Sequence, residues 1–437
     1  MPINELSKRV RAKHGLTQKK EVSHKKLGEL NLNSSGRDPL AILKLAEKDR
    51  LPQLLPVKYS RMQVNAFAFF RGSVGIMAHD LAHQPHTKLM VQLCGDAHLQ
   101  NLGCFAAPDG RVVFDINDFD ETTEGPWEWD VKRMATSIVL AGHESKHNDK
   151  QCAASVDTFV AAYCKTMQSL AAEPVLTAAR YMIHRLGKVA AVNAAFQQAQ
   201  RSKPADLLEK YAEKVKGQYK FKKVEHVLWP ASRQEHRQVL NSLKAYRQSL
   251  AADRLHFFEF YQPVDVAFKI VGTGSVALRD YVVLMEGHSP DDALFLQIKQ
   301  EVPSIYAPYL KHPHYDNQGI RVVMGQHRIQ ALSDLLLGWT RIGKFDYLVR
   351  QLNDHKGSLN LDNMRGKNLD SLAEVAGEIL ARGHARSGDA IAISSYLGDC
   401  QKVQKGIADF AEKYAEQAKE DFDVFKKAVD DKKIPAR

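Results

Sequence analysis

The stretch that decides the fold runs from Leu93 to Trp129 and reads LCGDAHLQNLGCFAAPDGRVVFDINDFDETTEGPWEW. It contains two short polar and acidic clusters, GDAHLQN and DINDFDE, and an apolar run precedes each of them. Apolar runs of this length predict strands, and carboxylates at strand ends can converge in one cleft. Several neighbouring negative charges require a cation, and an all-oxygen ligand set favours Mg²⁺ or Mn²⁺ over Zn²⁺. The stretch therefore predicts a site of phosphoryl transfer.

The first cluster supplies two groups that phosphoryl transfer needs. Asp96 and Asn101 lie five positions apart in a loop after an apolar strand. A carboxylate orients or deprotonates the attacking hydroxyl, and a nearby amide oxygen binds Mg²⁺, so we assign these roles to Asp96 and Asn101. His98 can bind a metal, but a hydrogen bond that holds the loop is the more plausible role.

The second cluster offers three competing carboxylates. Asp118 ends a strand-like run and would project into the same cleft, where it could ligate the metal that bridges nucleotide phosphates. Asp115 and Asp120 are alternative ligands. Each acidic cluster taken alone could also be a solvated turn, but two clusters within so few residues favour a site.

A third group of residues lies far downstream. Gly272, Gly274 and Ser275 form a GTGS turn between two strand-like runs, which would allow backbone N–H groups to approach phosphates. An ordinary hairpin turn is the alternative. Lys299 lies in the apolar run LFLQIKQE and is a candidate to hold the α- and β-phosphates. Its alternative is an outward residue on an edge strand.

The segment NAFAFFRGSVGIMAHDLA, residues 65–82, predicts one buried helix that contains Arg71. This arginine is expected either to pair with a carboxylate of the downstream clusters or to reach solvent from the helix edge. Other expectations for secondary structure are a hairpin around AAPDG, a helix from Trp129 to about residue 146, only helices in 150–256, and a helix over IRVVMGQHRIQALSDLLLGW. VDVAFKIVG, ALRDYVVLMEG and ALFLQIKQEV predict three successive strands.

Composition places few limits on function. The 437 residues exceed one ordinary core, and 44% hydrophobic with 26% charged residues is typical of a soluble globular protein. The net charge of +10 is compatible with nucleic acid, an acidic membrane or a nucleotide, but much of it lies in the N-terminal tail and one Lys-rich helix. We expect no membrane span, no signal peptide and no nucleic-acid partner. The five cysteines, with no CxxC pair, predict a reducing cytoplasm without disulfides or a zinc ribbon.

GDAHLQN followed by NDFDETTEGPWEWD resembles the catalytic and metal loops of the aminoglycoside phosphotransferase and choline kinase branch of the protein-kinase-like fold. The resemblance implies that Asp96 is the catalytic residue and that Asn101 and Asp118 bind metal. It also implies that Asp130 braces the catalytic loop. The interval from Asp118 to Asp130 fits the pattern and favours Asp118 over Asp115.

From about residue 55 onward the chain also resembles an uncharacterised bacterial family, the domain of unknown function 2252. The resemblance is carried by FAFFRGS, CGDAHLQNLG, FDINDFDETTEGPWEWDVKR, GTGSVALRDYVVLMEG, LFLQIKQE, LVRQLNDHKGS and GHARSGD. It is nearly full-length, and it brings no settled substrate.

One feature departs from the kinase-like pattern. Kinase-like proteins place the glycine turn and the lysine before the catalytic loop, whereas here both follow it, which implies circularly permuted lobes. The helix from Ile320 contains no glutamate to pair with Lys299, so Glu301 is the candidate partner.

We therefore expect an α+β, bilobal, protein-kinase-like fold that binds ATP with Mg²⁺ or Mn²⁺ and transfers a phosphoryl group to an acceptor that the sequence leaves open. The expected parts are a flexible basic arm (1–35), a helical catalytic lobe (36–257), a β-rich nucleotide lobe (258–357) and helices that pack back on the catalytic lobe (358–437). The alternatives are a metal-dependent phosphohydrolase or nuclease, a non-catalytic nucleotide-binding pseudokinase, and transfer of AMP instead of phosphate.

Overall fold

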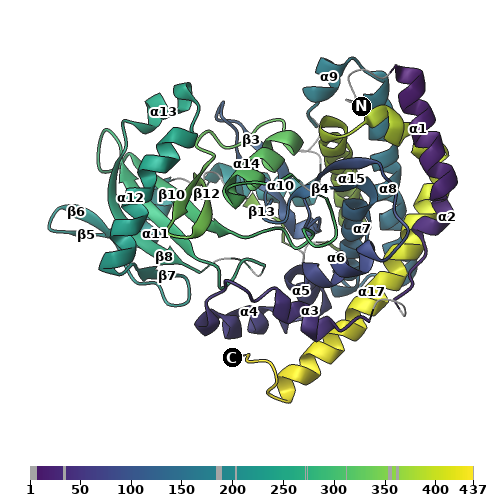
Figure 1. Ribbon diagram of the computed structural model, residues 1–437. Coiled ribbons are helices and arrows are strands. Elements are labelled where there is room, and N and C mark those ends of the chain that lie inside the picture. The colour runs from purple at the N-terminus through teal and green to yellow at the C-terminus, as the bar shows by residue number, and fades with distance from the viewer. Residues whose placement is uncertain are drawn as a thin grey trace.

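The chain folds into a mixed α and β structure with several antiparallel sheets. The computed structural model describes residues 7–32, 36–183, 189–201, 204–270, 272, 274–311, 313–352, 357–360 and 364–436. Figure 1 shows a sheet-rich side at the left and a helical side at the right, with the C-terminal helix along the outer edge of the helical side. Among the described residues, the helices lack a stretch with the length and apolarity that crossing a bilayer demands.

The largest sheet has six antiparallel strands in the order β11-β12-β10-β9-β8-β7. Its strands are β7 (Leu228–Pro230), β8 (Gln262–Lys269), β9 (Asp280–Glu286), β10 (Ala293–Glu301), β11 (Gly338–Ile342) and β12 (Phe345–Gln351). The three strands predicted from the apolar runs are confirmed as β8, β9 and β10. Lys299 lies near the end of β10, opposite Asp280 of β9.

The helix α14 (Gln318–Ile329) lies between β10 and β11 in the chain and contacts β10, β11 and β12. The prediction that this helix continues to Trp339 was wrong. After Ile329 the side chain of Asp334 turns the chain, because it accepts hydrogen bonds from the N–H groups of Leu336 at 2.8 Å and Gln351 at 2.6 Å.

Both faces of the sheet are covered, and part of the cover comes from residues before 258. The helix α12 (Arg233–Ser249) packs on one face through Val239, Leu243 and Tyr246. The expected lobe boundary at 257/258 therefore assigns α12 to the wrong side of the molecule. On the other face lies a hairpin of β5 (Ala212–Val215) and β6 (Gln218–Phe221), which corrects the expectation of only helices in 150–256.

The helical side is built around α7 (Trp127–Glu144), which is buried from Trp127 to Gly142. The helices α8 (Asp149–Ala172), α15 (Lys367–Ser387) and α17 (Cys400–Asp430) pack around it. The indole of Trp127 stacks on the ring of Tyr163 in α8, with 5.4 Å between the ring centroids. Figure 1 shows these helices side by side at the right of the molecule.

The prediction of a flexible arm over residues 1–35 was wrong for residues 8–27. These residues form α1 (Lys8–Glu21) and α2 (His24–Leu27), which pack on α16 (Ala390–Leu397) and α17. Serine N-caps begin both helices, and the guanidinium of Arg11 pairs with Asp389 at 2.8 Å. Lys8, Arg9, Lys13 and Lys20 of α1 are exposed, so the basic composition of this segment gives no indication of its packed face.

Smaller elements complete the fold. The expected hairpin is confirmed as β2 (Leu102–Ala106) and β3 (Val112–Ile116), and β13 (Gly357–Ser358) pairs with β2. The predicted helix over 65–82 is broken at Ser73 into two helices. The remaining elements are α3 (Pro39–Leu45), α4 (Leu55–Met62), α5 (Ala66–Gly72), α6 (Val74–Ala82), β1 (Met90–Leu93), β4 (Thr123–Pro126), α9 (Val175–Ala179), α10 (Ala190–Arg201), α11 (Pro204–Tyr211) and α13 (Ala252–Phe258).

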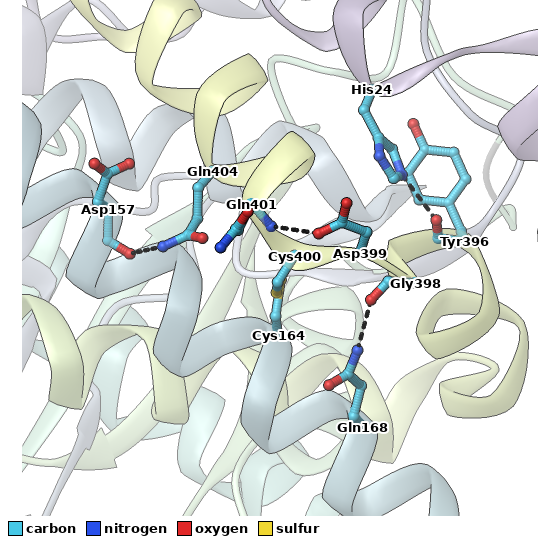
Figure 2. Close-up of a disulfide and its surroundings, with 10 residues drawn as sticks. All are labelled: His24, Asp157, Cys164, Gln168, Tyr396, Gly398, Asp399, Cys400, Gln401 and Gln404. Atoms are coloured by element: carbon cyan, nitrogen blue, oxygen red, sulfur yellow. Dashed lines mark hydrogen bonds between the residues drawn. A yellow bond between two sulfur atoms is a disulfide. The ribbon is translucent and has the colours of Figure 1, made fainter.

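A disulfide joins α8 to the first residue of α17 (Figure 2). It links Cys164 and Cys400, whose Cα atoms lie 6.3 Å apart although 236 positions separate them in the chain. The prediction that the chain has no disulfide was therefore wrong, because helix packing and not local spacing brings the two cysteines together. Beside it, Gln168 donates a hydrogen bond to the carbonyl of Gly398 at 3.1 Å.

We predict that Gly377→Ala destabilises the helical side. A Cβ atom at Gly377 of α15 would lie 2.3 Å from the carbonyl oxygen of Phe159 in α8, so the helices would have to separate. Overpacking of this kind costs about 1–3 kcal/mol, which exceeds the gain of about 1 kcal/mol in helix propensity. Thermal and denaturant unfolding measure the change.

The matched control is Ser371→Ala, a partly exposed position in the same helix. It should leave the free energy of unfolding within about 0.5 kcal/mol of the wild type. Equal stability of Gly377→Ala and the wild type would contradict the close approach of α8 and α15.

Candidate active site

The loop after β1 is held by the first turn of α7. The buried carboxylate of Asp130 accepts hydrogen bonds from the N–H of Cys94 at 2.7 Å and the N–H of Gly95 at 3.1 Å. Gly95 has φ +86°, and a Cβ atom there would lie 2.2 Å from the carbonyl oxygen of Glu121. Asp130 and Gly95 therefore fix the backbone that presents Asp96.

Asp96 is held in place by a buried arginine that the sequence analysis missed. The Nε of Arg133 donates to Asp96 Oδ1 at 2.7 Å, and Arg133 is fully buried on α7. His98 Nε2 lies 3.5 Å from the other carboxylate oxygen. Burial raises the pKa of Asp96, but the Arg133 and His98 groups outweigh it and lower the pKa to about 2. Asp96 is thus a fixed, ionised carboxylate.

Asn101 connects the first cluster to the second. Its side-chain Nδ2 donates to the backbone carbonyl of Asp96 at 2.8 Å, and its carbonyl accepts from the N–H of Asn117 at 2.9 Å. The first hydrogen bond uses the side-chain amide nitrogen of Asn101, so the side-chain amide oxygen could still bind a metal ion. The backbone bond places the start of the DFD sequence beside the first loop.

Lys299 reaches the second cluster from the sheet. Its Nζ lies 2.5 Å from Asp120 Oδ1 and 3.7 Å from Asp118 Oδ1, and the lysine side chain is only 3% exposed. Burial lowers the pKa of Lys299, but the two carboxylates outweigh it and raise it above the ordinary value. Burial raises the pKa of Asp118, but the charge of Lys299 outweighs burial and the net effect is a lower pKa. Burial and the charge of Asp118 raise the pKa of Asp120.

A second arginine, also missed, holds the backbone of this acidic loop. Arg321 of α14 donates to the carbonyls of Asp120 at 2.8 Å, Thr122 at 2.7 Å and Val302 at 2.8 Å. The helix that follows Lys299 in the chain is therefore tied directly to the loop that Lys299 contacts. The amphipathic pattern of residues 318–329 gave no sign of these partners of Arg321.

Asp115 has a structural role. Its Oδ1 accepts from Nη2 of Arg382 in α15 at 2.5 Å and from the N–H of Ile116 at 2.8 Å. It is buried and is not among the residues that line the cavity beside Asp118. Asp118 and not Asp115 is thus positioned to serve as a ligand.

A cavity of about 370 Å³ collects most of the predicted site residues. They are Arg71, Asp96, His98, Asn101, Asp118, Asp120, Gly272, Gly274 and Ser275. A second cavity, of about 180 Å³, lies on the sheet side and is lined by Lys299, Lys269, Gln297 and others. The two cavities adjoin at the acidic loop, because they share the lining residues Asn117, Asp118, Gly272, Ser275 and Arg350.

The glycine turn lies between β8 and β9. Gly272 has φ +62°, a conformation that favours glycine, and its carbonyl accepts a hydrogen bond from Arg61. A Cβ atom at Gly274 would come no closer than 4.0 Å to its nearest neighbour, the carbonyl of Arg71. Thr273 of the GTGS motif lies outside the described residues.

Arg71 lines the cavity without an ion pair among the described residues, so the expected carboxylate partner is not present within ion-pair distance. Its Nε is buried without a hydrogen-bond partner in the part of the chain that the structure describes. Burial lowers the pKa of Arg71, while Asp96 and Asp118 oppose this. The side chain is thus a cation within the electrostatic reach of Asp96 and Asp118.

A comparison with protein families gives one match. The family described as an uncharacterized protein conserved in bacteria (DUF2252) matches residues 50–428. The chain belongs to this family. The match covers the acidic loops, the glycine turn, Lys299 and Arg321. No curated protein and no solved structure matches the chain.

The oxygen donors fit a hard divalent cation that takes some of its ligands from the protein and others from phosphate. The amide oxygen of Asn101 and the carboxylate of Asp118 line the same cavity. The described residues contain no group of three or more His, Cys, Asp or Glu side chains able to hold a metal by themselves. Mg²⁺ is commonly held by one or two side-chain oxygens together with water and substrate phosphates, which is what this site offers.

We predict that Asp280→Asn stabilises the protein at neutral pH. Asp280 Oδ2 accepts from Gln297 at 2.7 Å, and Oδ1 is buried without a partner among the described residues. Burial raises its pKa from 3.8 to about 6. The folded state then binds more protons than the unfolded state between these values, so the wild type loses up to about 3 kcal/mol as pH rises through this window.

Asparagine does not titrate and retains an acceptor for Gln297. The variant should therefore match the wild type near pH 4 and exceed it in free energy of unfolding by pH 7, as measured in denaturant titrations. The exposed Asp253→Asn serves as the control and should show no such trend. A difference that does not change between pH 4 and 7 would contradict the assignment.

Proposed function

We propose that the protein is an ATP- and Mg²⁺-dependent phosphotransferase with a two-lobed, kinase-like active site whose segments occur in permuted order. The observation that carries the proposal is the contact of Lys299, in the wall of the smaller cavity, with Asp118 and Asp120, in the wall of the larger one, although 179 positions separate Lys299 from Asp120. Kinase-like enzymes use such a lysine to hold nucleotide phosphates and such an acidic residue to hold the metal.

The order of elements around the sheet supports this proposal. In protein kinases a glycine-rich loop precedes a lysine on the third strand of the nucleotide lobe. Here the glycine turn joins β8 to β9, Lys299 lies on β10, and α14 follows before β11 and β12. The three strands are neighbours in the sheet. This order resembles the internal order of a kinase nucleotide lobe and supports the proposal, although here these elements follow the proposed catalytic loops instead of preceding them.

The smaller cavity is the proposed place for the nucleoside. It is lined by Gln351 and Leu352, where the chain leaves β12 and continues to β13, which pairs with β2. The cavity therefore lies where the chain passes from the large sheet to the small sheet of β2, β3 and β13. Its polar side chains, including Gln297 and Lys269, offer donors and acceptors to a base and a ribose.

Asp96 would orient the acceptor hydroxyl. The hydroxyl oxygen forms the new bond to the γ-phosphorus, the bond from that phosphorus to the β–γ bridging oxygen breaks, and the hydroxyl proton passes to Asp96. Because its pKa is about 2, Asp96 is a weak base, and its larger contribution is to position the hydroxyl. Arg133 and His98 fix the carboxylate for this role.

Both the protein and the metal would balance the negative charge of the transferred phosphoryl group. Asn101 and Asp118 would hold Mg²⁺, which when bound neutralises charge on the β- and γ-phosphate oxygens. Arg71 supplies a further cation near Asp96 and Asp118. α14 contains no glutamate, so Asp120 takes the place of the usual helix carboxylate as the partner of Lys299.

We predict that ATP or a non-hydrolysable analogue raises the melting temperature only when Mg²⁺ or Mn²⁺ is present. At a ligand concentration of 100 times Kd the folded state gains about 2.7 kcal/mol, which is a shift of several degrees. Asp118→Ala should abolish the metal-dependent shift. Asp96→Ala should retain it but lose phosphate transfer, followed by nucleotide turnover and by intact mass for self-modification.

Asp109→Asn is the matched control, because this exposed carboxylate lies on the turn between the two clusters. It should behave as the wild type in both assays. Full activity of both Asp96→Ala and Asp118→Ala would contradict the assigned roles. Phosphate release without a nucleotide donor would instead favour a phosphohydrolase, and a nucleotide shift without turnover would favour a pseudokinase.

A further inference from the structure

Part of the larger cavity wall has a chemistry that nucleotide binding does not use. Besides Arg71, residues 42–58 contribute two further cations, Arg50 and Lys58, to this wall. Lys58 is only 1% exposed, and its position on α4 places its side-chain amine inside the protein. The apolar residues beside them in the cavity wall are Ile42, Leu43, Val74 and Ile76.

Lys58 has no hydrogen bond or ion pair within the described residues. Its nearest charged groups are Arg50, Glu47 and Glu121. Glu47 is engaged by the hydroxyl of Tyr59, and Glu121 accepts from the N–H of Ile305 at 2.7 Å. Both carboxylates are therefore hydrogen-bonded to other groups.

Arg50 likewise forms no ion pair within the part of the chain that the structure describes. Two of its nitrogen atoms donate to backbone carbonyls, those of Ala46 at 2.7 Å and Val276. Burial, and then the charge on Arg50, lower the pKa of Lys58 far below that of a free lysine. Two buried like charges are costly when the carboxylates that act on them, Glu47 and Glu121, are already hydrogen-bonded to other groups, and a bound anion would reduce this cost.

We propose that Arg50 and Lys58 bind a phosphate group carried by the acceptor, so that the acceptor is a phosphorylated small molecule. This inference rests on the proposed phosphotransferase function. A phosphate dianion matches two cations in charge, and charge-assisted hydrogen bonds to it are strong. The acceptor hydroxyl would then lie near Asp96, which lines the same cavity.

The position of the two cations separates this phosphate from those of the nucleotide. Arg50 and Lys58 line only the larger cavity, with Asp96, whereas Lys299 lines only the smaller one. The volume of about 370 Å³ and the apolar residues in the wall suit a small molecule with a short carbon skeleton.

Titration calorimetry with inorganic phosphate tests the proposal at constant ionic strength. The wild type, saturated with a non-hydrolysable ATP analogue and Mg²⁺, should still bind phosphate. Lys58→Met and Arg50→Gln should each weaken phosphate binding about tenfold or more, because each removes a charge-assisted bond, and both should keep the affinity for the nucleotide. Circular dichroism verifies that the variants are folded.

Lys132→Met is the matched control. Lys132 is also 1% exposed, and both ammonium groups lie over an aromatic ring, that of Lys132 at 4.2 Å from the centroid of Phe410 and that of Lys58 at 5.8 Å from the centroid of Tyr59. Unlike Lys58, Lys132 does not line the cavity. This variant should bind phosphate as the wild type does.

Three results would overturn the inference: no phosphate binding, phosphate binding that Lys58→Met and Arg50→Gln leave unchanged, or displacement of phosphate by the ATP analogue. The last result would assign the two cations to the nucleotide. Failure of the ATP analogue to bind the wild type would overturn the proposed function instead, and phosphate titration without nucleotide would still report on Arg50 and Lys58.

Discussion

The structure depends on burying a lysine against two carboxylates. Lys299, 3% exposed, can stay charged inside the protein only because Asp118 and Asp120 lie at 3.7 Å and 2.5 Å from its Nζ. A buried lysine charge without these carboxylates would be costly, so the contact of Lys299 with Asp118 and Asp120 requires the sheet-rich side to pack against the acidic loop. The same proximity creates the cavity in which a metal and phosphates would replace part of this pairing.

Two further buried arginines make that meeting precise. Arg133 of α7 fixes Asp96, and Arg321 of α14 donates to three backbone carbonyls around the acidic loop. The first belongs to the helical side and the second to the sheet-rich side, so each side contributes one anchor. Asp130 adds the backbone bonds that hold the loop before Asp96. The site is therefore built by buried, fully directed hydrogen bonds and not by the loops alone.

Much of the site could be predicted from the sequence because its residues are close together or lie on clear periodic patterns. Asp96, Asn101 and Asp118 fall in one stretch, and Lys299 is conspicuous in an apolar strand. Arg133 and Lys58 could not be assigned partners, since a single charge in a helical pattern does not show what it faces. Long-range packing could not be predicted either. The basic composition of α1 does not indicate its contact with α16, and Cys164 is brought next to Cys400 only by the packing of α8 and α17.

The central claim is that Lys299, Asp118 and Asn101 surround one nucleotide–metal site. A crystal structure of the protein with a non-hydrolysable ATP analogue and Mn²⁺, with the metal located by anomalous scattering, tests it most directly. We predict the metal at about 2.1 Å from oxygen atoms of Asp118 and Asn101, with Lys299 Nζ in hydrogen-bond contact with the α- or β-phosphate. A metal held by other residues, or phosphates bound away from Lys299, would contradict the account.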